Sequence, residues 1–149
     1  MSVIFMDGAN MQDLTTWTQS RFFSPSFNSA IFDGPLRIYF AQIHESFALK
    51  ICFGMQQQFE KLLARAKKNS RLKGRNICIL LYPNEETFRL SFEKENEFIV
   101  HDRLGDNAVL ALRGPFSEDS LSIILQAIAT QLNSWESEIS EPAEMFASL

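Results

Sequence analysis

The chain has 149 residues, of which 46% are hydrophobic, and its 14 basic and 18 acidic residues give a net charge of −4. This length is typical of a single domain, and a domain of this size buries a substantial core. Six glycines and five prolines are too few for a collagen-like or a Pro/Gly-rich disordered chain. The apolar content also excludes a chain that is disordered throughout.

The N-terminal part of the chain predicts a helix followed by a hairpin. Residues 10–20 carry apolar side chains at three- and four-residue spacing, which is typical of a helix. Residues 27–32 and 36–43 predict two strands. The turn signal Asp33-Gly34 lies between them, so we expect the two strands to pair as a hairpin.

The longest predicted helix covers residues 45–69. One apolar stripe runs along its length, and Phe47 and Phe53 add a second apolar edge in its first half. Such a helix is buried on more than one side, and in a small domain the second side is a candidate subunit interface. Gly54 costs this helix about 1 kcal/mol relative to alanine, which the close approach of another backbone would explain.

The second half of the chain predicts four strands and a helix. Residues 76–82 are apolar throughout and predict a central strand that is buried on both faces. Residues 87–92, 97–102 and 108–112 predict three further strands, which would follow as an antiparallel meander. Ser117 is the expected N-cap of the last helix, which has acidic residues in its first turn.

The predicted fold is α+β, with a mostly antiparallel sheet of five to six strands, a long central helix, and flanking N- and C-terminal helices. Residues 1–137 are expected to form one domain, and residues 138–149 an acidic, flexible tail. The order α-β-β-α-β-β-β(β)-α resembles that of the Roadblock, longin and profilin-like folds, in which a five-stranded antiparallel sheet carries a long helix on one side. The resemblance is one of element order alone and implies no function.

The two cysteines and the hydropathy pattern predict in which cellular compartment the protein is located. Cys52 and Cys78 lie in apolar runs and fit no metal or redox spacing, so we expect buried, reduced thiols. A disulfide between them would need an oxidising compartment. We expect no signal peptide and no membrane span, because no apolar run approaches about 18 residues. The expected location is the cytoplasm.

The residues that could carry chemistry form no recognisable catalytic or metal-binding motif. The two histidines, His44 and His101, are each followed by an acid, but adjacent residues of a strand point to opposite faces. The sequence contains no H-E-x-x-H, C-x-x-C, P-loop, G-x-G-x-x-G or G-x-S-x-G motif. We therefore predict no catalytic residue, no metal site and no cofactor.

Phenylalanine is unusually frequent, with 14 residues. An aromatic-rich core accounts for most of them, and the alternative is an exposed apolar surface. Aromatic residues are enriched at the centres of protein interfaces. The candidates for a partner or dimer surface lie in a Ser/Pro loop or off the main helical stripe, and they are Phe22, Phe23, Phe27, Phe47 and Phe53.

Charge is unevenly distributed along the chain. A basic block of seven cations without an acid consists of Lys61, Arg65, Lys67, Lys68, Arg71, Lys73 and Arg75, whereas residues 115–149 carry six acids and no base. The block predicts a site for an acidic partner or another anion. The alternative is a helix end whose cations complement the helix dipole, with the acidic tail folded over it. The negative net charge and the absence of an aromatic residue within the block argue against a dedicated nucleic-acid binder.

We predict a non-catalytic regulatory or adaptor protein that acts through protein–protein contacts as a homodimer, using the long helix and a sheet edge. One alternative is a small acidic chaperone or immunity-type protein that masks a single partner. Another is a small-molecule sensor or enzyme with a pocket between helix and sheet. The last is nucleic-acid binding through the basic block, which would weaken with salt.

Overall fold

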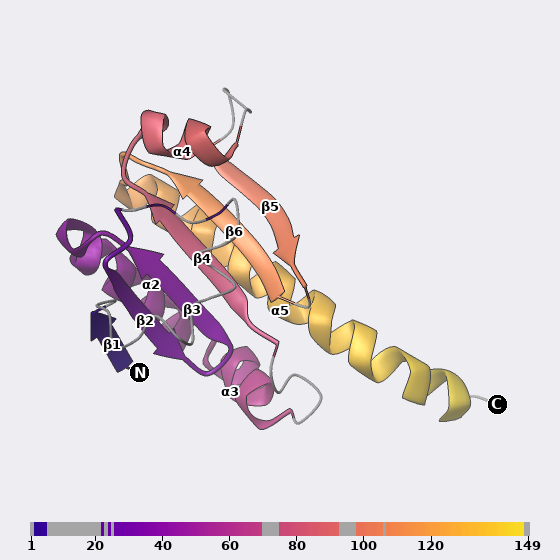
Figure 1. Cartoon of the computed structure of the whole chain (residues 1–149). Helices are drawn as coiled ribbons and strands as arrows, with labels where there is room; N and C mark the ends of the chain where they lie inside the picture. Colours follow the sequence, from indigo (N-terminus) through magenta and orange to yellow (C-terminus); the bar gives the residue numbers. More distant parts are fainter. Residues whose placement is uncertain are drawn as a thin grey trace.

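The computed structural model describes residues 2–5, 22, 24, 26–69, 75–92, 98–105 and 107–147, with side chains for all of these except 2–5 and 136–147. The six strands are β1 (Ser2–Phe5), β2 (Ser29–Asp33), β3 (Leu36–Phe40), β4 (Ile77–Tyr82), β5 (Ile99–Leu104) and β6 (Asn107–Arg113). The helices within the described residues are the 3-10 helix η3 (Gln42–His44), α2 (Glu45–Gln58), α3 (Glu60–Lys68), α4 (Glu85–Ser91) and α5 (Glu118–Ala147). Figure 1 shows a twisted sheet with the long helix α5 lying across one face.

The strands form one mixed sheet in the order β1-β2-β3-β4-β6-β5. Strand β4 pairs in parallel with β3 and β6, and the other three pairings are antiparallel. The α+β class is confirmed, but the prediction of a mostly antiparallel sheet was wrong, because α2 and α3 carry the chain back from the end of β3 to the start of β4. The two parallel pairings also remove the antiparallel sheet implied by the resemblance to the Roadblock, longin and profilin-like folds.

The first three strands form a meander. Strand β1, which was not predicted, pairs antiparallel with β2 and places Val3 opposite Ile31. The hairpin of β2 and β3 is confirmed, and Gly34 occupies its turn with a φ of 58°, a left-handed conformation that favours glycine. The helix predicted for residues 10–20 lies outside the described residues.

The segment beginning at Thr87, which was predicted to be a strand, is the helix α4. Phe88 within α4 and Phe92 directly after it are both buried, whereas Leu90 between them is 84% exposed. Asn84 forms a capping box: its side chain accepts the N–H of Thr87 at 2.9 Å, and its own N–H donates to the Thr87 hydroxyl at 3.4 Å. The predicted strand was wrong because the alternation of apolar residues was also compatible with one helical face.

The single helix predicted over residues 45–69 is divided into α2 and α3. The break falls at Phe59, whose φ of −129° and ψ of 33° are not helical. The amide of Phe59 still donates to the Met55 carbonyl at 3.0 Å, and its carbonyl accepts from the Leu63 amide at 2.9 Å. Since no proline or glycine lies between Met55 and Leu63, the sequence offered no signal for this break.

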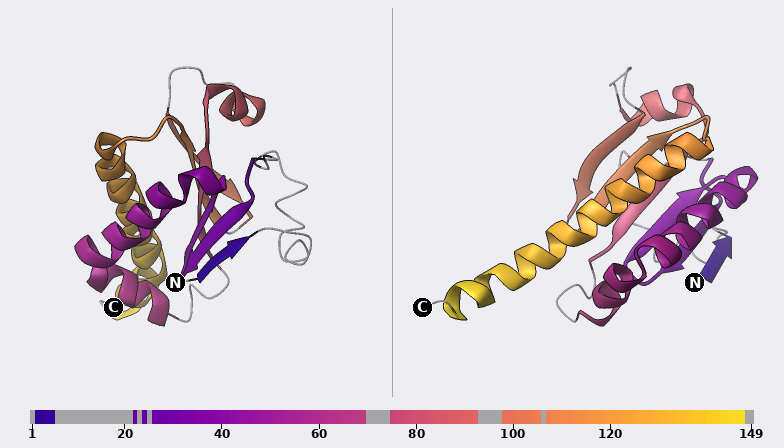
Figure 2. Two further views of the ribbon diagram at one scale, coloured as in Figure 1. Left: turned by 90° about the vertical axis from the view of Figure 1, so that its left-hand side faces the viewer. Right: turned by 180° about the vertical axis from the view of Figure 1, so that it is seen from behind.

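The helices α2, α3 and α5 cover one face of the sheet, as Figure 2 shows. Inward side chains of the central strands, such as Ile38, Ile79 and Leu110, pack there against the buried faces of the helices. Every residue of β4 is buried, which confirms the prediction of a central strand covered on both faces.

The opposite face carries an aromatic cluster around Tyr82. Its ring lies 5.0–5.9 Å from the rings of Phe27, Phe88 and Phe92, measured between centroids. The Tyr82 hydroxyl donates to the carbonyl of Phe22 at 2.6 Å, which satisfies a buried polar group. This cluster accounts for part of the phenylalanine surplus.

Helix α5 begins after Ser117, as predicted. The amide of Ser120 donates to the Ser117 hydroxyl at 3.4 Å, and the amide of Ser117 donates to the Ser120 hydroxyl at 2.9 Å. The helix runs to Ala147, so the backbone of residues 138–147 is helical, while a domain boundary at 137 and flexibility of the tail stay predictions. No helix of the described part of the chain is sufficiently long and apolar to cross a membrane.

Candidate functional site

The described part of the basic block lies mainly on helix α3. Lys61, Arg65, Lys67 and Lys68 belong to this helix, and Arg75 lies half-buried just before β4. Arg71 and Lys73, the other two predicted cations, lie outside the described residues. The structure therefore concentrates four of the seven predicted cations on one short helix.

Helix α3 has an apolar face and a cationic face. Leu62, Leu63 and Ala66 are buried in the core under the helices. Three exposed cations, Lys61, Arg65 and Lys68, stand on the opposite side at positions i, i+4 and i+7, which share one side of a helix. We call these three residues the outer cationic face.

Lys67 does not belong to the outer cationic face. Its ammonium group lies 2.9 Å from the carboxylate of Asp33, whose side chain is only 3% exposed. The same carboxylate accepts a hydrogen bond from the Gln56 amide at 3.2 Å and one from the Cys52 thiol at 3.6 Å. Helices α2 and α3 thereby hold the turn between β2 and β3.

The electrostatics of Asp33 follow from these contacts. Burial pushes the pKa of its carboxyl upwards, but the hydrogen bonds from Lys67 and Gln56 and the charge of Lys67 outweigh burial, so the pKa lies below its ordinary value. Asp33 is thus ionised at neutral pH. From the sequence Asp33 is predicted only as a turn residue, because nothing local indicates that Lys67 of α3 reaches it.

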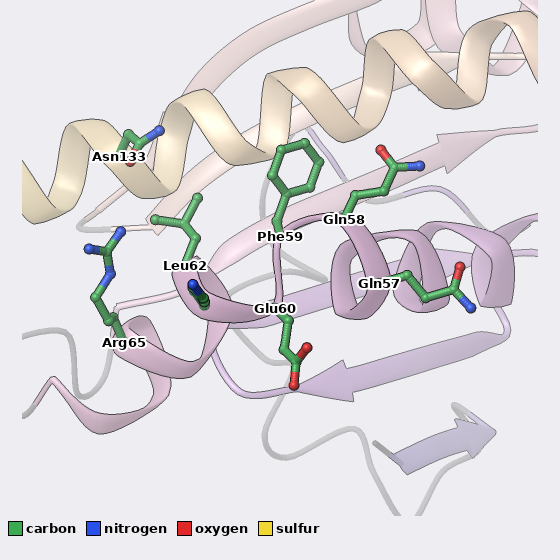
Figure 3. Close-up of a pocket in the computed structure, with 8 residues that line it drawn as sticks. Gln57, Gln58, Phe59, Glu60, Leu62, Arg65 and Asn133 are labelled. Atoms are coloured by element: carbon green, nitrogen blue, oxygen red, sulfur yellow. The ribbon is translucent and has the colours of Figure 1, made fainter.

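A groove opens beside the outer cationic face, where α2 gives way to α3. It has a volume of about 420 Å³, and Figure 3 shows the Phe59 ring directed from the break towards α5. The groove is bordered by amide, charged and apolar side chains from α2, α3 and α5, namely Gln57, Gln58, Phe59, Glu60, Lys61, Leu62, Arg65 and Asn133. Amides both donate and accept hydrogen bonds, so these walls suit a peptide backbone as well as acidic side chains.

The five candidate phenylalanines do not form one surface. Phe22 and Phe27 are buried at 3% and 6% exposure in the aromatic cluster, so they are not available on the surface of this chain. Phe47 is half-buried and stacks on Phe116 with the ring centroids 4.9 Å apart. Phe53 is 46% exposed on the outer side of α2, and Phe23 lies outside the described residues.

The second apolar side of α2 packs within this chain. Phe47 meets Phe116 just before α5, and Lys50 pairs with Glu118 at the start of α5. A Cβ atom on Gly54 would lie 2.7 Å from Cδ1 of Leu125, so the close approach predicted there is real but involves a side chain of α5 instead of a backbone. The α2–α5 contact therefore accounts for Phe47 and Gly54, whereas Phe53 remains exposed on the outer side of α2.

The two cysteines are buried free thiols, as predicted. Cys52 belongs to the core under the helices and Cys78 to the core on the opposite face, so the sheet lies between them. Burial raises the pKa of each thiol to about 12, and the charge of Asp33 adds to this effect at Cys52. Both thiols are therefore protonated at neutral pH, and the thiolate is the nucleophilic form.

The histidines lie apart in the fold. His44 precedes α2 and meets the Phe116 ring edge-on at 5.2 Å, and burial lowers the pKa of its imidazole. His101 lies exposed on β5 in a shallow groove shared with Trp135. Within the described residues, no group of three or more His, Cys, Asp or Glu side chains is placed to hold a metal ion.

Comparison of the chain with protein-family models, with curated proteins and with solved structures gave no match.

Proposed function

We propose that this chain is a non-catalytic regulatory or adaptor protein that binds an acidic segment of a protein through the outer cationic face of α3 and the groove at Phe59. One observation carries the proposal. Of the four cations on α3, Lys67 pairs with the buried carboxylate of Asp33, whereas Lys61 and Lys68 are exposed on the outer side of the helix. Exposed cations in a row attract and orient an acidic partner.

The shape of the site favours a peptide over a small anion. Lys61 and Lys68 are seven residues apart, which corresponds to about 10 Å along a helix. A small anion would contact one end of this row, whereas a peptide with several acidic residues spans it. The amides of Gln57, Gln58 and Asn133 border the same groove and supply partners for a peptide backbone.

The alternative functions require different structural features. A chaperone or immunity-type protein would use the same surface but form a tight one-to-one complex with a single partner. A sensor or enzyme would need a cavity between helices and sheet, where Ile38, Ile79 and Leu81 are fully buried in the packed core. A cytoplasmic location remains part of the proposal.

The test is fluorescence anisotropy with a labelled oligoglutamate peptide as the acidic probe. The expected result for the unaltered chain is binding that weakens as salt is raised. The variant Lys61→Glu/Lys68→Glu should weaken it on the order of tenfold, because each exposed contact contributes up to about 1 kcal/mol and each is reversed in sign.

The matched control is Arg89→Glu/Arg103→Glu, which changes the net charge equally but lies on α4 and β5. It should leave the affinity within about twofold. An equal loss in both variants, or no binding of the probe, would contradict the proposal. Tighter binding of a single-stranded oligonucleotide than of oligoglutamate would favour nucleic-acid recognition instead.

A further inference from the structure

The C-terminal end of α5 projects away from the rest of the molecule. Helix α5 has 30 residues, which corresponds to about 45 Å at 1.5 Å per residue. Trp135 is the last residue with a described side chain, and it is buried against the sheet. Figures 1 and 2 show the helix continuing well past the ends of the strands, with its last turns beside no other element.

The sequence of this projecting end continues the pattern of the buried face. Ile128, Leu132 and Trp135 are buried under the sheet at four- and three-residue spacing. Ile139 and Phe146 occupy the same helical phase further along. An apolar stripe that outlasts the sheet is typical of a helix that packs against a partner.

The charges of the projecting end complement those of α3. Residues 136–149 contain four acids and no base, namely Glu136, Glu138, Glu141 and Glu144. The basic block, residues 61–75, contains seven cations and no acid in sequence, and four of these cations lie on α3, whose first residue is Glu60. The chain thus carries both an acidic helical segment and a basic surface that fits such a segment.

We propose that the partner of the outer cationic face is the projecting end of α5 from a second copy of this chain. The inference rests on the proposed function, since it names the occupant of the same site. Two copies exchange their helix ends reciprocally, so each donates one acidic segment and receives one, which closes the contact as a two-fold dimer.

The geometry favours a second copy over a contact within one chain. In a single chain α5 passes the groove at the level of Asn133, which borders it together with Arg65 of α3. Beyond that point the helix continues to Ala147 without a break. A continuous helix that leaves past the sheet does not turn back to run along the outer side of α3.

The experiment is a charge exchange in the full-length chain, with solution mass measured by light scattering over a concentration series. The unaltered chain should approach twice its 17.1 kDa mass. Lys61→Glu/Lys68→Glu should weaken self-association at least tenfold, because α3 and the helix end then repel each other. Glu138→Lys/Glu141→Lys/Glu144→Lys, which changes the helix end instead of α3, should weaken self-association to a similar extent.

Mixing the two variants in equal amounts should restore the dimer, because each basic surface then meets an acidic one across the interface. A chain carrying both sets of changes should dimerise again as well. A monomeric unaltered chain would overturn the proposal, and so would variants that stay dimeric alone or a mixture that stays monomeric. If these results occur while oligoglutamate still binds α3, the inference fails and the proposed function stands.

Discussion

Helix α3 carries two kinds of lysine within a single turn. Lys67 lies 2.9 Å from the carboxylate of Asp33, which is 3% exposed, and thereby ties the helix to the turn of the β2–β3 hairpin. Both lysines are exposed, but Lys68, which follows Lys67 directly in sequence, lies on the same side of the helix as Lys61. The residue type and the sequence neighbourhood are the same, and the surroundings differ.

The contrast separates a structural cation from surface cations. Removing Lys67 would take a positive partner away from a buried carboxylate, which costs folding free energy. Removing Lys61 or Lys68 would leave no buried group unsatisfied, so their cost to stability is small. A basic block in a sequence is therefore a mixture of cations, and only their contacts show which of them are available to a partner.

Among the cations of α3, the largest effect on stability is expected at Lys67. Lys67→Met keeps most of the aliphatic stem but removes the charge, so we expect a loss of about 2 kcal/mol in unfolding free energy, below the usual range for buried pairs because Lys67 is 40% exposed. Urea unfolding followed by circular dichroism measures it. Lys68→Met is the matched control, and a loss of similar size there would remove the distinction between the two lysines.

Gly34, in the turn of the β2–β3 hairpin, provides a second test of the structural role of Lys67. A Cβ atom on Gly34 would lie 2.6 Å from Cγ of Lys67, whereas one on Gly105, which has a similar φ of 63°, would meet nothing within 4 Å. Gly105→Ala should cost about 1 kcal/mol from backbone strain alone. Gly34→Ala should cost about 1 kcal/mol more, because the methyl group displaces Lys67 from Asp33.

The control for this pair is the Lys67→Ala background, which removes the crowding side chain. There the two glycine substitutions should cost the same in urea unfolding. A difference that persisted without the lysine stem would show that the extra cost at Gly34 has another origin.

The pH dependence of stability should report on Asp33. Its folded pKa lies below the ordinary value, so between the two values the unfolded chain binds more protons than the folded chain, and stability rises with pH there. The ionised carboxylate therefore contributes fully above about pH 4 and loses its contribution as the pH falls further. The difference in stability between the unaltered chain and Asp33→Asn should shrink below that pH, and a difference that grew on acidification would contradict this sign.

The smallest effect on stability is expected at the outer cationic face. Lys61→Glu/Lys68→Glu should change the unfolding free energy by no more than about 0.5 kcal/mol, because both side chains are exposed. Leu62→Ala on the buried side of the same helix should cost about 2–3 kcal/mol. A comparable loss in both variants would mean that the outer cations are also part of the fold.

The fold was predictable where one local signal dominated. The apolar run of β4 indicated a central strand, and the N-cap at Ser117 together with its first-turn acids located the start of α5. The prediction of a strand at Thr87 was wrong because Phe88 and Phe92 fit the spacing of a strand as well as that of a helix. The parallel pairings of the sheet were not predicted either, because strand direction depends on where the connecting helices lie and not on the strand sequences.

Only part of the candidate site could be predicted from the sequence. The density of cations between Lys61 and Arg75 marked the region correctly, because charge is a local property. The role of Lys67 was hidden, since its partner Asp33 lies on a distant strand. The groove was hidden too, because it arises from a helix break at Phe59 that no proline or glycine indicates.

The measurement that tests this account most directly compares the affinity of labelled oligoglutamate for Lys61→Glu/Lys68→Glu and for Lys67→Met. The account predicts that the first variant keeps its stability and loses affinity on the order of tenfold. The second should lose stability and, at a temperature where it is folded, keep its affinity within about twofold. An equal loss of affinity in both variants, or a loss confined to Lys67→Met, would contradict the assignment of binding to the outer cationic face.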